Sequence, residues 1–120
     1  MNFALDMSNW INTYEWSHIA TLRKPWKITD NGFYSIMNKL KRRKEIYSLF
    51  GAMEYDYDTN YNHIHLLLNT SIVDRGMLRE LLGRGSDNIV GYMKEVKSNE
   101  AVSKYCTKHL NKVQTWDIKI

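Results

Sequence analysis

The sequence predicts an α+β domain in which a mainly antiparallel sheet of about five strands carries its helices on one face. Two observations lead to this prediction. Segments with the spacing of strands and of helices follow one another in the order β-α-β-β-α-β-α. The chain has 120 residues, which suits one compact domain over residues 1–120. This order is the split βαβ, or ferredoxin-like, arrangement.

The strands are predicted from segments rich in β-branched and aromatic residues that end at turn residues or at proline. Pro25 ends the first strand, and a turn at residues 58–60 separates the second from the third. The predicted strands span residues 17–24, 46–57, 63–69 and 88–96, with an edge strand at 113–120.

The helices are predicted from apolar residues at helical spacing and from capping residues at the N-termini. Thr29 or Asp30 caps the first helix, and Ser71 with Asp74 forms a capping-box-like pair at the start of the second. The predicted helices run from the first cap to about residue 44, from 71 to 83–85, and from 99 to 112. Residues 6–16 form either a short helix or an irregular lead-in.

Composition excludes several classes of protein. Hydrophobic residues make up 43% of the chain and charged residues 25%, which is typical of a globular domain. The longest apolar run, at 64–68, is too short to cross a bilayer, and the N-terminus lacks the pattern of a secretory signal. We therefore expect a protein that works inside a cell, in the host cytoplasm, without a membrane partner. A single cysteine, Cys106, excludes an internal disulfide and a cysteine-based zinc cluster.

Charge is distributed unevenly along the chain, whose formal net charge is +4. Residues 21–50 are strongly basic, whereas residues 51–70 contain carboxylates and neither Lys nor Arg. An acidic centre beside a basic flank suits a metal site next to a track for phosphates, although a solvated helix face beside an acidic turn explains the same charges. The cations expected to contact a polyanion are Arg23, Lys24, Lys27, Lys41, Arg42, Arg43, Lys104 and Lys112.

The predicted strand at 63–69 carries His63 and His65 on one face, because side chains alternate across a strand. Two such imidazoles can bind one divalent ion, although a His-x-His pair alone is more often two exposed histidines. The preceding strand carries Glu54 and Asp56 on one face, which a hairpin brings beside the histidines. A His-His-carboxylate set without thiolates suits Mn²⁺ or Mg²⁺, with zinc as a chemical alternative. Glu54 is the first choice for the third ligand and Asp56 the second.

The predicted helix at 99–112 carries Tyr105 at the margin of its apolar side, one turn from Lys108. Most helical tyrosines pack their ring and leave the hydroxyl in water. A nucleophilic tyrosine needs a positive charge, a base or a metal-polarised electrophile nearby, because a phenol with a pKa of about 10 keeps its proton at neutral pH. Lys108 can supply this charge, or neutralise the phosphorane that forms during attack on a phosphate.

Together, His63-Ile64-His65 followed by leucines and the later Tyr105-Cys106-Thr107-Lys108 resemble two motifs of the HUH endonucleases. The resemblance is greatest to single-tyrosine replication initiators, the Rep proteins of small DNA viruses and rolling-circle plasmids. Residues 20–22 are similar to a loose version of the first motif of this family, and Glu54 lies where its acidic ligand is common. Such minimal initiators also occur in rod-shaped archaeal viruses.

The resemblance implies a mechanism, a cofactor and partners. Mn²⁺ or Mg²⁺ held by His63, His65 and Glu54 would polarise the scissile phosphate for attack by Tyr105. The products would be a 5′-phosphotyrosine and a free 3′-hydroxyl, and the reverse step would join strands without ATP. The substrate would be single-stranded DNA at a replication origin. A single nucleophilic tyrosine is compatible with action as a homodimer. The absence of a G-x-x-x-x-G-K-[ST] motif is compatible with the use of a separate host or viral helicase.

Two other interpretations fit the same residues. Single-tyrosine transposases of insertion elements share the His-hydrophobe-His strand and a tyrosine helix, and their third ligand resembles His109, four positions after the tyrosine. A non-catalytic single-strand or RNA-binding module on the same fold would stack bases on aromatic residues and need no metal. The candidates for stacking are Trp16, Trp26, Tyr55 and Tyr57.

Overall fold

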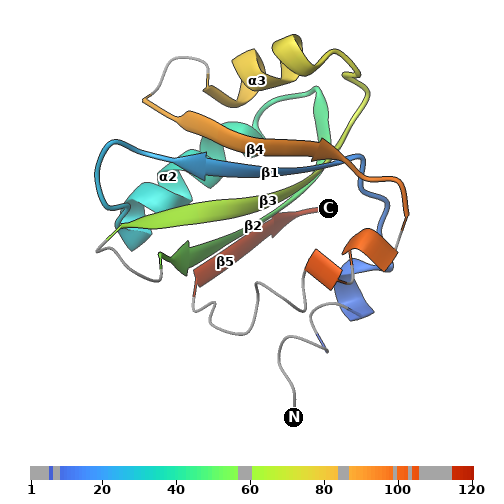
Figure 1. Cartoon of the computed structure of the whole chain (residues 1–120), viewed down its shortest axis with the longest axis horizontal. Helices are drawn as coiled ribbons and strands as arrows, with labels where there is room; N and C mark the ends of the chain where they lie inside the picture. Colours follow the sequence, from blue (N-terminus) through green and yellow to red (C-terminus); the bar gives the residue numbers. More distant parts are fainter. Residues whose placement is uncertain are drawn as a thin grey trace.

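The computed structural model describes residues 6, 9–56, 61–83, 87–98, 100–102, 104–105 and 115–120. It is an α+β structure built on one five-stranded antiparallel sheet with the strand order β4-β1-β3-β2-β5 (Figure 1). The strands are β1 (His18–Arg23), β2 (Ile46–Tyr55), β3 (Asn62–Thr70), β4 (Ile89–Glu95) and β5 (Thr115–Lys119). The labelled helices are α2 (Asp30–Lys41) and α3 (Arg75–Gly83). Within these residues, no helix is both long and apolar enough to cross a membrane.

The strand order is the split βαβ arrangement that the sequence predicts. Helix α2 connects β1 to β2, and β3 lies between these two strands. Helix α3 connects β3 to β4, and β1 lies between that pair. Strand β5 pairs with the outer side of β2, so the predicted edge strand is confirmed.

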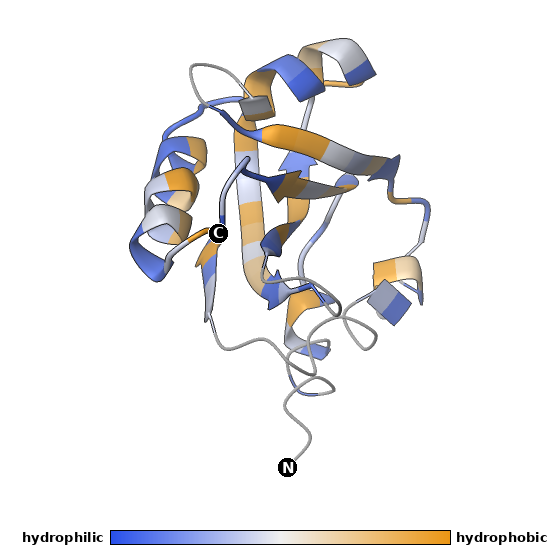
Figure 2. Ribbon diagram, turned by 60° about the vertical axis from the view of Figure 1, so that its left-hand side comes forward, coloured by the Kyte–Doolittle hydropathy of each residue, from blue (hydrophilic) through white to orange (hydrophobic). Residues whose placement is uncertain are grey.

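Helices α2 and α3 cover one face of the sheet and form the larger core with it. The alternate residues Ile64, Leu66 and Leu68 of β3 are fully buried there. They pack in one cluster with Phe33 and Met37 of α2 and with leucines of α3. Figure 2 shows the hydrophobic residues of α2 turned toward the strands. Each large side chain buried in this way stabilises the fold by roughly 1.5–3 kcal/mol.

The opposite face of the sheet is also partly covered, so the prediction that all helices lie on one face is wrong. Ile11 and Val102 are buried in a second core cluster with Leu67 of β3. They belong to short helical segments, at residues 9–11 and at 100–102 and 104–105, which lie side by side in Figure 1. The physical reason is that this face has apolar positions of its own, which stay out of water only if other elements cover them.

One end of each labelled helix differs from the prediction. Thr29 caps α2 as predicted, because its side chain accepts a hydrogen bond from the N–H of Gly32 at 3.0 Å. The helix nevertheless ends at Lys41, and Nζ of Lys119 on β5 donates a hydrogen bond to the carbonyl oxygen of Lys41 at 2.7 Å. Asp74 caps α3, because its Oδ1 accepts a hydrogen bond from the N–H of Met77 at 2.9 Å. Ser71, the predicted first residue of this helix, lies before it.

Helix α2 approaches β2 closely at Gly51. A β-carbon built at this glycine would lie 2.4 Å from Sδ of Met37 and 2.6 Å from its Cε. Both distances are well inside van der Waals contact, so any side chain at residue 51 would have to displace Met37. The glycine therefore gives the end of the Met37 side chain room to pack between α2 and the sheet.

We predict that Gly51→Ala lowers the free energy of unfolding by about 1–3 kcal/mol, because the added methyl group overpacks the core beside Met37. Urea denaturation followed by circular dichroism measures this change. Gly83→Ala is the matched control, since a β-carbon there would lie 3.6 Å from the carbonyl oxygen of Asn88, an ordinary contact. An equal loss of stability in both variants would contradict the packing argument.

Candidate active site

The pairing of β2 with β3 positions the predicted metal ligands. In the antiparallel register Glu54 lies opposite His63, and Ala52 lies opposite His65. These residues share the face of the sheet that carries Leu67, because side chains alternate along each strand. The predicted faces of both strands are confirmed, and one hairpin brings a carboxylate beside two imidazoles.

Three donor atoms converge at this end of the sheet. Nε2 of His65 lies 2.7 Å from Oε2 of Glu54 and 3.0 Å from Nε2 of His63. One ligand atom from each residue lies within 4.8 Å of the other two. Two ring nitrogens this close repel each other unless a proton or a cation lies between them. The group formed by Glu54, His63 and His65, called the metal group below, can therefore hold a metal ion.

The donor types of the metal group suit Mn²⁺ and Mg²⁺. A carboxylate oxygen is a good ligand for either ion, and imidazole nitrogen favours Mn²⁺ over Mg²⁺. His65 is almost fully buried, whereas Glu54 and His63 are half-buried, so the group is open to solvent on the side of these two residues. Open coordination positions on that side are what an ion acting on a phosphate needs.

A carboxylate and a guanidinium orient His63 from behind. Nδ1 of His63 lies 2.6 Å from Oδ1 of Asp56, and Nη1 of Arg23 donates a hydrogen bond to Oδ2 of Asp56 at 2.6 Å. The hydrogen bond from Arg23 lowers the pKa of Asp56, against a smaller opposing effect of burial, and the contact with His63 lowers it further. An ionised Asp56 holds the ring proton on Nδ1 of His63 and leaves Nε2 to face the metal group.

Tyr105 meets the other histidine. Its hydroxyl makes a short hydrogen bond with Nδ1 of His65, forty residues away in the sequence. The two rings meet edge to face, with their centroids 5.2 Å apart. Val102 on the same helical segment is buried in the second core cluster and holds the segment on the sheet. As predicted, Tyr105 lies at the margin of the apolar side of its helix, and its hydroxyl is directed to the metal group.

The structure places two of the predicted third ligands differently. Glu54 points into the metal group, whereas the two oxygens of Asp56 contact His63 Nδ1 and Arg23. The geometry therefore favours Glu54 as ligand and gives Asp56 an orienting part. His109, the transposase-like alternative, lies outside the described residues, as do Lys108 and Lys112.

The predicted cations that the structure describes lie at separate places on the molecule. Arg23 lies beside the metal group, whereas Lys24 and Arg43 line a cavity on the other face of the sheet. Lys41 makes an ion pair with Asp117 on β5 at 2.5 Å.

Lys27, Arg42 and Lys104 are exposed. Nζ of Lys27 lies 5.2 Å from the ring centroid of Tyr55. Lys104 pairs with Glu100 at 3.2 Å. Both contacts are made at the surface, where they leave the cations accessible to an anion.

The aromatic residues predicted to stack bases separate into two groups. Trp26 and Tyr55 are 51% and 54% exposed and keep that potential. Trp16 is buried, and its Nε1 donates a hydrogen bond to the carbonyl oxygen of Ile11 at 2.9 Å. Its predicted role in stacking is therefore wrong, because the ring fills the second core cluster. Tyr57 lies outside the described residues.

Sequence patterns did not single out Asn62, and they singled out Thr21 only as part of the loose motif at residues 20–22. Asn62 is buried beside His63, and its side chain exchanges two hydrogen bonds with the backbone of Ile28, each of 2.8 Å. These bonds fasten the loop between β1 and α2 to the start of β3. Thr21 lies opposite His65 in the β1–β3 register, and its Oγ1 accepts the N–H of Tyr92 where β1 and β4 shift register. A polar residue at the buried end of a strand is the only signal that the sequence offers for Asn62.

The described residues thus bring a group that can hold a metal ion and a phenol hydroxyl to one end of the sheet. The chain matches no protein-family model, and no curated protein or solved structure matches it. Geometry and chemistry are therefore the basis of the functional conclusion.

We predict that alanine at His63, His65 or Glu54 weakens Mn²⁺ binding by at least about tenfold, because each change removes one protein ligand. Asp56→Asn should weaken binding about tenfold while leaving a measurable site, because it disturbs only the orientation of His63. Isothermal titration calorimetry gives these affinities. Asp117→Asn is the matched control on β5 and should bind Mn²⁺ like the unaltered protein. Equal losses in the Asp117 and Glu54 variants would exclude the metal group as the binding site.

We predict that Asn62→Ala lowers the free energy of unfolding by about 2 kcal/mol, because the buried N–H and C=O of Ile28 lose their partner. Thermal and urea unfolding measure the loss. Asn38→Ala, at an exposed position of α2, is the control and should change stability little. If Asn62→Ala is as stable as the control, the loop between β1 and α2 does not depend on this side chain.

Proposed function

We propose that this protein nicks and rejoins single-stranded DNA through covalent attachment of the strand to Tyr105, as in the HUH replication initiators that its sequence resembles. One observation carries the proposal. The hydroxyl of Tyr105 contacts Nδ1 of His65, whose Nε2 points at Glu54 and His63. A tyrosine nucleophile beside a group that can hold a divalent ion is what such a reaction requires.

Each residue of the site has a part in this proposal. Glu54, His63 and His65 would hold Mn²⁺ or Mg²⁺, which when bound supplies Lewis-acid polarisation of the scissile phosphate. When Nε2 of His65 faces the metal group, Nδ1 carries the ring proton and donates it to the phenol oxygen of Tyr105. That hydrogen bond orients the oxygen and supports loss of its proton. Asp56, kept ionised by Arg23, fixes the ring of His63.

The proposed reaction exchanges one phosphate ester for another. The phenol oxygen of Tyr105 forms a bond to phosphorus, while the bond between phosphorus and the 3′-oxygen breaks. The phenol gives up its proton and the departing 3′-oxygen takes one up, which yields a 5′-phosphotyrosine and a free 3′-hydroxyl. Because the tyrosine ester keeps the energy of the original bond, a 3′-hydroxyl can reverse the step and join strands without ATP. Lys108 would add positive charge near the phosphate, a part that stays a prediction.

The biological part of the proposal is initiation of rolling-circle-type replication at an origin. Its support is the combination of the two motifs with their convergence in space. The position of Glu54, 2.7 Å from His65, favours the initiator over the transposase-like ligand set. A non-catalytic binding module would give no reason for Tyr105, His65 and Glu54 to meet. A homodimer and a separate helicase remain predictions from the resemblance.

We predict that Tyr105→Phe abolishes the covalent adduct while leaving the fold intact, because only the hydroxyl is nucleophilic and the ring still packs. The measurement mixes protein, Mn²⁺ and a labelled random-sequence pool of single-stranded oligonucleotides, and detects adducts on a denaturing gel. Mass spectrometry then locates the modified residue.

Tyr92→Phe is the matched control for this experiment. Tyr92 is an exposed tyrosine that lines the same groove as Tyr105, so its loss should leave adduct formation unchanged. An adduct that persists in Tyr105→Phe and disappears in Tyr92→Phe would identify a different nucleophile. Absence of any adduct with the unaltered protein in Mn²⁺ would contradict the proposed function.

A further inference from the structure

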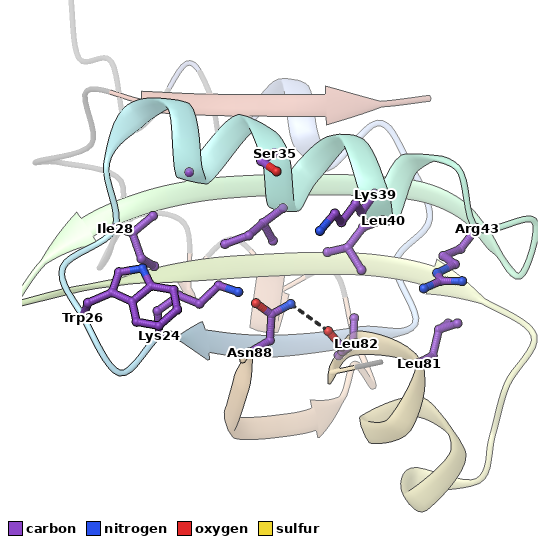
Figure 3. Close-up of a pocket in the computed structure, with 12 residues that line it drawn as sticks. Lys24, Trp26, Ile28, Ser35, Lys39, Leu40, Arg43, Leu81, Leu82 and Asn88 are labelled. Atoms are coloured by element: carbon purple, nitrogen blue, oxygen red, sulfur yellow. Dashed lines mark hydrogen bonds between the residues drawn. The ribbon is translucent and has the colours of Figure 1, made fainter. Parts of the chain in front are cut away.

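A cavity lies on the face of the sheet opposite the metal group. It has a volume of about 210 Å³ and opens between α2 and α3, beside the end of β1 (Figure 3). Its floor is apolar and is made by residues of both helices, including Ile36 and Leu81. Lys24, Lys39 and Arg43 also line it, and in Figure 3 the amino groups of both lysines point into it.

The described lining of the cavity is positively charged and contains no negative charge to balance it. The described residues that line it include three cations and no carboxylate. Burial and, to a smaller degree, the nearby charge of Lys39 lower the pKa of Lys24, whereas Asp87 outside the lining raises it. An anion bound between the two lysines would relieve their mutual repulsion. Asp87 would compete with such an anion for Lys24.

Trp26 adds a planar surface at one end of the cavity. Its ring is 51% exposed, and Nζ of Lys24 lies 5.6 Å from the ring centroid. An exposed aromatic ring beside cations is the combination with which proteins bind bases and phosphates together. Ser35 and Asn88 also line the cavity and add polar side chains to it, and Nδ2 of Asn88 donates a hydrogen bond to the carbonyl oxygen of Leu82 at 3.0 Å.

We propose that this cavity binds one nucleotide, with its phosphate among Lys24, Lys39 and Arg43 and its base against Trp26 and the apolar floor. The volume of about 210 Å³ is below the roughly 300–1,000 Å³ of pockets for drug-sized ligands, which limits the occupant to a single unit. No residue of the metal group lines the cavity, so this site is separate from the proposed nicking chemistry.

The nucleotide has two sources, a free nucleoside phosphate or one unit of single-stranded DNA. Arg23 and Lys24 are consecutive at the end of β1, yet Arg23 contacts Asp56 and His63 whereas Lys24 lines the cavity. A strand that leaves the metal group around this end of the sheet therefore meets the cations of the cavity. This continuity favours single-stranded DNA, and only this choice of source rests on the proposed function.

The test measures binding in EDTA, so that no divalent ion at the metal group contributes. Adenosine 5′-monophosphate, single-stranded oligodeoxyadenylate and inorganic phosphate are titrated separately, with ¹⁵N-resolved NMR shifts as readout. Lys39→Gln should weaken binding of the nucleotide about tenfold, because it removes one charged partner of the phosphate. Trp26→Ala should remove the preference for nucleotide over inorganic phosphate. Asp87→Asn should strengthen binding, because a competing carboxylate is lost.

Lys44→Gln is the matched control, since Lys44 is an exposed cation that follows α2 and does not line the cavity. The proposal would be overturned if Lys44→Gln and Lys39→Gln weakened nucleotide binding equally. It would also be overturned if none of the three probes bound. Equal affinity for inorganic phosphate and nucleotide, unchanged in Trp26→Ala, would overturn the assignment of a nucleotide. If the oligonucleotide binds more tightly than the mononucleotide and Lys39→Gln weakens its binding, the source is single-stranded DNA. If the mononucleotide binds at least as tightly as the oligonucleotide, the source is free nucleotide. None of these outcomes depends on adduct formation at Tyr105, so the two proposals fail separately.

Discussion

The register between β2 and β3 is the constraint on which the whole site depends. Because side chains alternate along a strand, a slip of one residue would turn either His63 or Glu54 to the helix-covered face. The buried alternation of Ile64, Leu66 and Leu68 opposes such a slip, since it would move three apolar side chains out of the larger core. The hydrophobic core beneath the sheet therefore maintains the geometry of the polar group above it.

The position of Tyr105, the proposed nucleophile, depends on a different kind of interaction. Tyr105 is brought to His65 by a helical segment whose Val102 packs with Ile11 and Leu67 on the second face of the sheet. This packing is non-local, because it joins residues 11 and 102 across β3. The packing that excludes water from Leu67 also directs the hydroxyl of Tyr105 to the metal group.

Local patterns predicted the parts of the site that lie within single elements. The period of two placed His63 and His65 on one face and paired them with Glu54, and helical spacing placed Tyr105 at the edge of an apolar stripe. The chain of contacts from Arg23 through Asp56 to His63 could not be predicted, because it joins three strands and depends on side-chain directions. The face of the sheet on which the basic segment lies could not be predicted either, because charge along the sequence gives no indication of side. Helix α2 carries its cations to the face opposite the metal group.

The fold features that could be predicted also depend on local patterns, and those that could not depend on contacts between distant residues. Strand order followed from the sequence of elements, whereas the cover of the second face depended on apolar residues at 11 and 102 that only tertiary structure brings together. Trp16 shows the limit of composition, since an aromatic residue that suits base stacking proved to fill a core.

The metal group and the cationic cavity thus lie on opposite faces of one sheet, and Arg23 and Lys24 lie next to one another between them at the end of β1. The central claim is that two imidazoles and one carboxylate from a single hairpin hold a divalent ion next to Tyr105. Electron spin-echo modulation of Mn²⁺ bound to the protein tests this claim directly, because it detects nitrogen nuclei coordinated to the ion. The account predicts the signal of two coordinated imidazole nitrogens, reduced to one in His63→Ala. A spectrum without nitrogen coupling, from Mn²⁺ held by oxygen alone, would contradict it.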